Sequence, residues 1–164
     1  GHPRRSGVLV FLGYMLTIAV LTLAAGTHYV RSLRASQLER AEKLIGKQKY
    51  GVALQWIDQS CQYPSTPFAG IPDYLRGLAF QGIGEREEAE FYYLRSYRLD
   101  PWFFRCVAQL ALFYADSEGT PAERSKKVAP YLSRLNNEFS YHSSLPLVVS
   151  EVEQKLSDSG TSNE

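Results

Sequence analysis

The sequence predicts an all-α protein, in which one N-terminal transmembrane helix is followed by a small array of helical hairpins. No residue from Ser6 to Val30 is charged at neutral pH. Beyond this stretch, apolar residues recur at the three- and four-residue spacing of helices, and breaker-rich segments separate the helical stretches. The expected order is a basic tail at residues 1–6, a transmembrane helix at 7–30, a helical domain at 31–156 and a flexible tail at 157–164.

The apolar run from Gly7 to Val30 is long enough to cross a bilayer. As a helix it would extend about 36 Å at ~1.5 Å per residue, whereas the hydrocarbon layer is ~30 Å thick. A cleaved signal peptide is the alternative, because Arg4 and Arg5 give a basic start and residues 24–26 are small. Since the run is longer than the usual core of a signal peptide, we expect an uncleaved anchor.

The flanks of the anchor bear on its orientation. We expect the N-terminus in the cytoplasm and the helical domain on the extracytoplasmic, periplasmic side, because a short basic tail before a signal-like apolar run is typical of an uncleaved export signal. The count of lysine and arginine favours the opposite orientation, since the flank after Val30 is slightly richer in them.

Two features of the anchor suggest contacts with other molecules. Small residues at helical spacing would permit close packing of a neighbouring helix in lipid, and they are Gly13, Thr17, Thr22 and Gly26. His28, at the edge of the run, could ligate a metal, a haem or a chlorin. An interfacial histidine without a ligand is the commoner case, and Tyr29 beside it fits the aromatic belt of a membrane interface.

After the anchor, the apolar periodicity predicts a first helical hairpin. The anchor could continue directly into its first helix, whose apolar face is formed by Leu38, Ala41, Leu44 and Ile45. The second helix runs from Tyr50 to Cys61. It ends before a breaker-rich connection that contains Pro64, Pro67 and Pro72.

The next helix pair carries the clearest motif in the chain. Its small residues, aromatic residues and final proline are Gly77, Phe80, Gly84, Ala89, Tyr93 and Pro101. Their spacing resembles that of the tetratricopeptide repeat, a helical hairpin of 34 residues. The resemblance implies that Gly77 and Ala89 lie where the two helices cross closely, that Phe80 and Tyr93 fill the space beside them, and that Pro101 ends the second helix.

Internal repetition supports the resemblance. Ala111 lies 34 residues after Gly77, which is the tetratricopeptide period. Ala53 in the first pair matches Ala89 after a shift of 36, so the connection between these pairs is slightly longer. The resemblance covers about residues 34–135, and a plain helical bundle with coincidental spacing is the alternative.

The third pair departs from the pattern in its turn. Its second helix should begin with a capping box formed by Thr120 and Glu123, with Pro121 at the first helical position. Pro130 should kink this helix. A last amphipathic helix at about residues 146–156 would cap the open end of the array.

The sequence contains no recognisable set of catalytic residues. The histidines do not have the spacing of metal ligands, and two cysteines, Cys61 and Cys106, are too few for a disulfide framework or a zinc cluster. We expect both cysteines to be small buried side chains. The 16 basic and 17 acidic residues beyond the anchor, at positions 31–164, nearly balance, which argues against a nucleic-acid partner. We therefore expect no enzyme activity, no cofactor and no small-molecule substrate.

The resemblance implies a protein partner, since tetratricopeptide domains often bind proteins along the surface lined by the first helix of each pair. The corresponding positions here are Leu38, Glu42, Tyr74, Leu78, Ala108 and Leu112. They lack the lysine and asparagine of the carboxylate-clamp subclass, so that function does not transfer. We expect an apolar groove for a partner's segment or helix, lined by Tyr74, Leu78, Ala108 and Leu112.

A second expected partner surface is the aromatic patch of Trp102, Phe103 and Phe104, because three rings directly after Pro101 have little core to enter. The sequence thus favours a membrane-anchored scaffold that acts as an accessory subunit of a larger membrane complex, for instance an energy-transducing one. An assembly or quality-control factor is the alternative within this class. A pigment-binding or haem-binding protein, or an enzyme, that uses His28 is the alternative outside it.

Overall fold

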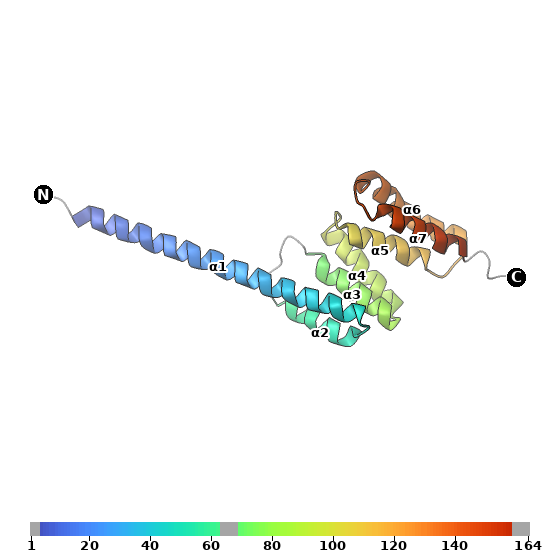
Figure 1. Cartoon of the computed structure of the whole chain (residues 1–164), viewed down its shortest axis with the longest axis horizontal. Helices are drawn as coiled ribbons and strands as arrows, with labels where there is room; N and C mark the ends of the chain where they lie inside the picture. Colours follow the sequence, from blue (N-terminus) through green and yellow to red (C-terminus); the bar gives the residue numbers. More distant parts are fainter. Residues whose placement is uncertain (1–3, 63–68, 159–164) are drawn as a thin grey trace.

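The computed structural model describes the backbone of residues 4–62 and 69–158, with side chains from residue 13 onward. The described part is helical without any strand, which confirms the predicted all-α class. A long helix projects from a bundle made by the others (Figure 1). The helices of the described part are α1 (Arg4–Gly46), α2 (Tyr50–Ser60), α3 (Ile71–Ile83), α4 (Arg86–Leu99), α5 (Phe104–Ala115), α6 (Pro121–Glu138) and α7 (Leu145–Asp158).

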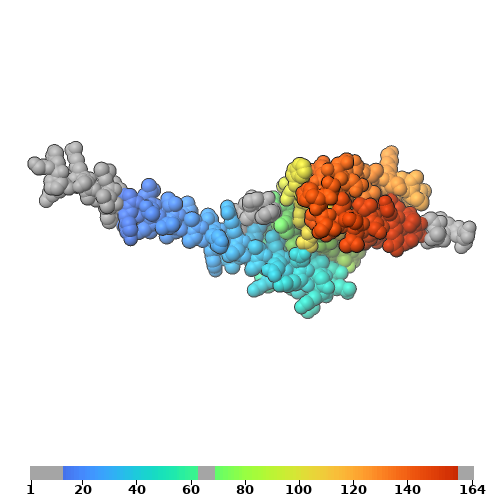
Figure 2. Space-filling model, turned by 45° about the horizontal axis from the view of Figure 1, so that its top comes forward, coloured from blue at the N-terminus to red at the C-terminus, as the bar shows by residue number. Residues whose placement is uncertain are grey.

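Helix α1 joins the expected anchor to the array without a break. It begins within the expected basic tail at Arg4 and its 43 residues continue through position 30 to Gly46, over about 65 Å at ~1.5 Å per residue. Every side chain from residue 13 to 29 is exposed, whereas Arg34 and Ala41 are buried. The exposed part stands clear of the other helices (Figure 2). The surroundings of α1 therefore change near residue 30 while its secondary structure does not.

Within the described residues, α1 is the one helix long and apolar enough to cross a membrane, judged by length and composition. None of its most apolar window is buried by the rest of the chain. The Thr17 hydroxyl donates to the Gly13 carbonyl at 2.9 Å and the Thr22 hydroxyl to the Ile18 carbonyl at 3.0 Å. The threonine hydroxyls on the predicted packing face therefore already donate within α1. A neighbouring helix would pack against this face through close van der Waals contact with its small side chains.

The array consists of helix pairs that pack side by side. The end of α1 pairs with α2, α3 with α4, and α5 with α6, while α7 packs against both α5 and α6 (Figure 1). Ser157 and Asp158, expected in the flexible tail, belong to α7. The rest of that tail, residues 1–3 of the basic tail and the prolines at 64 and 67 lie outside the described residues.

Small residues set two of the helix crossings. A Cβ atom added to Gly77 would lie 2.4 Å from the Cδ1 atom of Tyr93, so α3 and α4 can approach this closely only with glycine at that position. Sequence reasoning missed Gly82, where a Cβ atom would lie 2.3 Å from the Tyr50 ring of α2. Phe80 of α3 stacks on the ring of Tyr92 of α4, with centroids 5.3 Å apart.

A buried carboxylate ties α2, α3 and α4 together. Asp73, only 3% exposed, accepts two hydrogen bonds from the guanidinium of Arg95 on α4 and one from Arg76 on α3. Arg76 also donates to Asp58 of α2 at 2.7 Å. Because a buried charge is costly unless it is paired, this network fixes how the three helices sit against one another.

The predicted capping box of α6 is confirmed. The Glu123 amide donates to the Thr120 hydroxyl at 3.3 Å, and the Thr120 amide donates to the Glu123 carboxylate at 2.9 Å. These bonds satisfy two backbone donors that a helix start leaves without partners. The helix then continues through Pro130 to Glu138.

Candidate functional site

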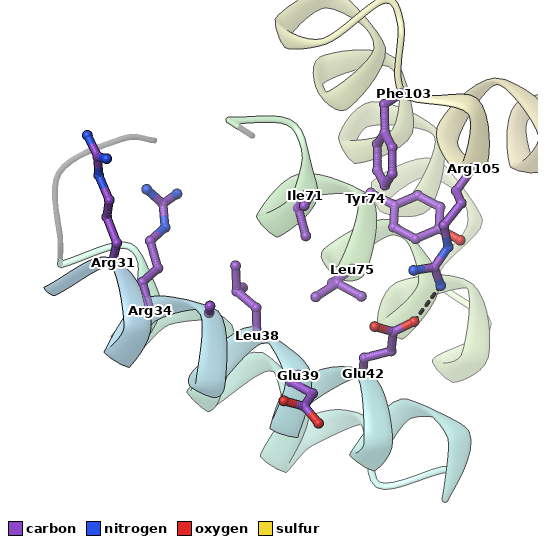
Figure 3. A pocket seen from close by; sticks show the side chains of 11 residues that line it. Arg31, Arg34, Leu38, Glu39, Glu42, Ile71, Tyr74, Leu75, Phe103 and Arg105 are labelled. Carbon is purple, nitrogen blue, oxygen red and sulfur yellow. Dashed lines mark hydrogen bonds and ion pairs between the residues drawn. The ribbon is translucent and has the colours of Figure 1, made fainter. Parts of the chain in front are cut away.

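A cavity of about 480 Å³ lies between α1, α3 and the start of α5 (Figure 3). We call it the α1–α3 cavity. Residues spaced by three or four positions share one face of a helix, which explains how α1 and α3 each present a continuous wall to it. The lining side chains used below are Arg31, Arg34, Ala35, Leu38 and Glu42 of α1, Ile71, Tyr74 and Leu75 of α3, and Phe103 with Arg105 at the start of α5.

Tyr74 is the central side chain of the cavity wall. Its ring meets the Phe103 ring edge-on, with centroids 5.1 Å apart, and the Arg105 guanidinium lies over it at 5.2 Å. Arg105 also donates to Glu42 and so links α5 to α1 (Figure 3). Burial raises the pKa of Tyr74 and Arg105 opposes this rise, with the net shift upward. The phenol is therefore neutral at physiological pH, and Tyr74 acts as an apolar wall rather than as a base.

The charges of the cavity are unevenly distributed along α1. At the end far from the exposed stretch, Glu42 pairs with Arg105, and Glu39 pairs with Lys43 at 2.6 Å. At the near end the cavity is lined by Arg31, which is exposed, and by Arg34, which is 6% exposed. None of the described residues that line this near end is acidic. An occupant with a negative group beside Arg31 and an apolar body would match this arrangement.

The structure brings together part of the predicted groove. Tyr74 lines the cavity, whereas Ala108 is buried and Leu78 and Leu112 are half-buried against the core. Leu38, at one of the corresponding positions on the first helix of its pair, lines the cavity as well. Of the residues predicted to line the groove, only Tyr74 lines the α1–α3 cavity, so this cavity lies at the end of the predicted groove nearest α1.

The predicted aromatic patch is divided, because Trp102 and Phe104 both contact the Phe139 ring whereas Phe103 contacts Tyr74. Trp102 is 66% exposed, whereas Phe103 lines the α1–α3 cavity. Phe104 packs against Phe139 and stacks on His142, with centroids 3.6 Å apart. The expectation that these rings have little core to enter is wrong for Phe103 and Phe104, because both are half-buried at the start of α5, where they pack against Tyr74 and Phe139.

The remaining candidate residues lie apart from the cavity. Cys106 is buried as expected, and burial raises the pKa of its thiol to about 11. Cys61 is exposed, contrary to expectation, because it caps the end of α2, where it accepts a hydrogen bond from Arg76 at 3.4 Å. His28 is exposed on α1, and the described residues hold no group of three or more potential metal ligands.

Sequence reasoning missed the cavity although the signal for it was present. Arg31, Ala35, Leu38 and Glu42 recur at spacings of four, three and four residues, which places them on one helical face. The spacing within α1 does not show which helix forms the opposite wall of the cavity, because that depends on how α1 packs beside α3.

Comparison with protein-family models, curated proteins and solved structures found no match to this chain. The tetratricopeptide resemblance therefore stays a prediction that rests on residue spacing.

Proposed function

We propose that the protein is a membrane-anchored scaffold that binds another subunit of a membrane complex and stabilises it there. One observation carries the proposal: a single helix, α1, contains both an apolar stretch that the other described residues leave exposed and the first wall of the helical array. Large exposed apolar surfaces mark contacts with lipid or protein. The uncovered stretch would lie in the bilayer, and the array would stand at its surface.

Continuity of α1 has a consequence for binding. Without a flexible linker, the array would keep a nearly fixed height and orientation relative to the bilayer, so a partner in the same membrane would meet the same surface each time. Tethering also raises the effective concentration of the array near such a partner. The array would sit on the periplasmic side, a proposal that rests on the short basic segment before the apolar stretch of α1.

The helix pairs favour a protein partner. Their order, the close crossing at Gly77 and the 34-residue spacing to Ala111 are those expected of tetratricopeptide units, which as a family bind proteins. Trp102 is a strong candidate contact, because tryptophan is enriched among the residues that dominate binding energies and this ring is largely exposed. A stable accessory subunit and a transient assembly factor would both use such a surface.

The test is quantitative co-purification of the full chain from its native membrane in a mild detergent. We expect a partner at fixed stoichiometry. Trp102→Ser should weaken its retention about 30-fold if Trp102 contributes ~2 kcal/mol, with the helical circular dichroism unchanged. Val52→Ser, at another exposed apolar position, is the matched control.

Three other results would be informative. Substoichiometric partner recovery would favour the assembly factor. Equal loss of partner retention in Trp102→Ser and Val52→Ser would show that Trp102 is not a specific contact with the partner. A monodisperse monomer from gently solubilised membranes would contradict the scaffold proposal.

A further inference from the structure

The α1–α3 cavity begins where the uncharged stretch of α1 ends. Arg31 directly follows that stretch, and Arg34 lies one turn further along. The polar headgroup region of a bilayer adds about 5–8 Å on each side of the hydrocarbon core, and four residues of helix rise about 6 Å. If the uncharged stretch spans the bilayer, both arginines lie at the depth of the lipid phosphates. This placement rests on the proposed function.

The apolar part of the cavity lies within reach of a lipid chain held at that depth. Leu38 is eight residues beyond Val30, a rise of about 12 Å along the helix, and Tyr74 and Phe103 face it across the cavity (Figure 3). A hydrocarbon layer of ~30 Å is two chains thick, so one chain extends about 15 Å. A chain that turns out of the bilayer beside Arg31 can therefore reach the apolar wall.

We propose that the α1–α3 cavity binds one acyl chain of an anionic membrane lipid, whose negatively charged headgroup lies against Arg31. The charge at the near end matches the headgroup, and the side chains of Leu38, Leu75 and Phe103 match the chain. Arg34, nine-tenths buried beside the same end, adds to the positive potential there. Toward the far end, Glu42 is already paired with Arg105, so the charges there do not compete for the headgroup.

Size and energetics favour a lipid over a segment of a partner protein. The volume of about 480 Å³ falls in the ~300–1,000 Å³ range of sites for small ligands. Moving a chain from the bilayer into this cavity exchanges one apolar environment for another, while it removes the apolar walls of the cavity from water. Anionic lipids are also concentrated at the membrane surface, where basic side chains attract them.

The test uses the full chain reconstituted into phosphatidylcholine nanodiscs that contain a small fraction of phosphatidylglycerol with a photoreactive group at the end of one acyl chain. Cross-linked residues are mapped by mass spectrometry. We expect cross-links within residues 13–30, from lipid around the helix, and also at Leu38, Leu75 or Phe103. A photoreactive phosphatidylcholine should give the cross-links within residues 13–30 but few cross-links at Leu38, Leu75 or Phe103.

Three variants separate the cavity from lipid that merely surrounds the anchor. Arg31→Gln should lower the cavity cross-links about fivefold, the usual contribution of one basic side chain near an anionic surface. Ala35→Phe, at an exposed position on the cavity wall, should block the chain without changing any charge. Lys47→Gln, an exposed charge beyond α1, is the control and should leave the cross-links unchanged. Circular dichroism should be the same for all three.

Several outcomes would overturn the proposal. Cross-links confined to residues 13–30, or cavity cross-links that survive both Arg31→Gln and Ala35→Phe, would show that the cavity holds no acyl chain. Loss of the cavity cross-links on addition of inorganic phosphate would indicate a site for free phosphate instead. If the cavity cross-links disappeared only when a co-purified protein was bound, the cavity would be assigned to that protein. No cross-link even within residues 13–30 would place α1 outside the bilayer and would contradict the proposed function as well.

Discussion

The two parts of α1 are built from the same kind of helix and differ in what covers them. From residue 34 onward, one face of α1 is covered by α2 and α3, and Ala41 has no exposed surface. Between residues 13 and 29, large apolar side chains such as Leu21 and Leu23 remain more than half exposed. The chain's own helices therefore cover one face of α1 within the array, whereas they leave the large apolar side chains of residues 13–29 exposed, as is typical of a surface that contacts lipid or protein.

This difference separates two kinds of substitution. A change within the array should alter the free energy of unfolding of the array while the protein stays in the membrane. A change in the exposed stretch of α1 should alter membrane attachment while the array stays folded. The following predictions concern the array. The three substitutions can be measured on the full chain in detergent micelles by urea denaturation monitored by far-ultraviolet circular dichroism.

The largest effect is expected at the buried carboxylate of α3. Asp73→Ala leaves Arg95 and Arg76 without their shared partner, and breaking a buried ion pair costs about 3–5 kcal/mol. We expect a loss near 3 kcal/mol, because Arg95 can be partly hydrated. Asp58→Ala is the control, since Asp58 pairs with the same Arg76 from an exposed position where ion pairs contribute ~0–1 kcal/mol. Equal losses for the two variants would contradict the structural role of Asp73.

A smaller loss is expected at the crossing of α3 and α4. Gly77→Ala forces a Cβ atom against the Tyr93 ring, and overpacking of a core typically costs about 1–3 kcal/mol. Gly51→Ala on α2 is the matched control, because a Cβ atom there meets nothing within 4 Å. Alanine should stabilise that helix by up to ~1 kcal/mol. If Gly77→Ala were also stabilising, the crossing would be looser than described.

The start of α6 should contribute less. Thr120→Ala removes the side-chain half of the capping box, which typically costs about 1 kcal/mol. Thr120→Asp restores an acceptor at the same place and should recover most of the loss. A Thr120→Asp variant as unstable as Thr120→Ala would show that the cap does not stabilise the array.

The two cysteines should differ in their reactivity toward alkylating reagents, and the ionisation of Cys106 should have little effect on the free energy of unfolding near neutral pH. Iodoacetamide should modify the exposed Cys61 and spare Cys106 until the array unfolds. Burial raises the pKa of Cys106 to about 11 from its ordinary value of 9.0. Since the unfolded chain then releases this proton first, the contribution of Cys106 to stability is complete below pH 9 and is lost between pH 9 and about 11. Fast modification of Cys106 in the folded protein at pH 8 would contradict its burial.

Local patterns predicted the fold well because each depends on residues close in sequence. The uncharged stretch, the capping box at Thr120 and the helical periodicity all act within one helix, and the structure contains the helices they predict. Gly77 lies at a close helix crossing, as the tetratricopeptide resemblance implied.

The candidate site was predicted only in part, because it is formed by helices far apart in sequence. Tyr74 was identified as a surface residue of the first helix of its pair, and it does line the cavity. The contacts of Phe103 with Tyr74, and of Arg105 with Glu42, depend on how α5 packs beside α3 and α1. No periodicity within one segment contains that information, and the same holds for the contact of Phe104 with His142.

The central claim, that lipid covers the exposed part of α1 while the chain's own helices cover the rest, can be tested by spin-label accessibility in nanodiscs. Single cysteines would be placed at Val20 and Lys47 in a protein that lacks Cys61 and Cys106, and relaxation by oxygen and by a water-soluble nickel chelate compared. We expect the label at position 20 to be accessible to oxygen and shielded from nickel, and the label at position 47 to show the reverse. A label at position 20 that nickel relaxes as strongly as the label at position 47 would contradict the account.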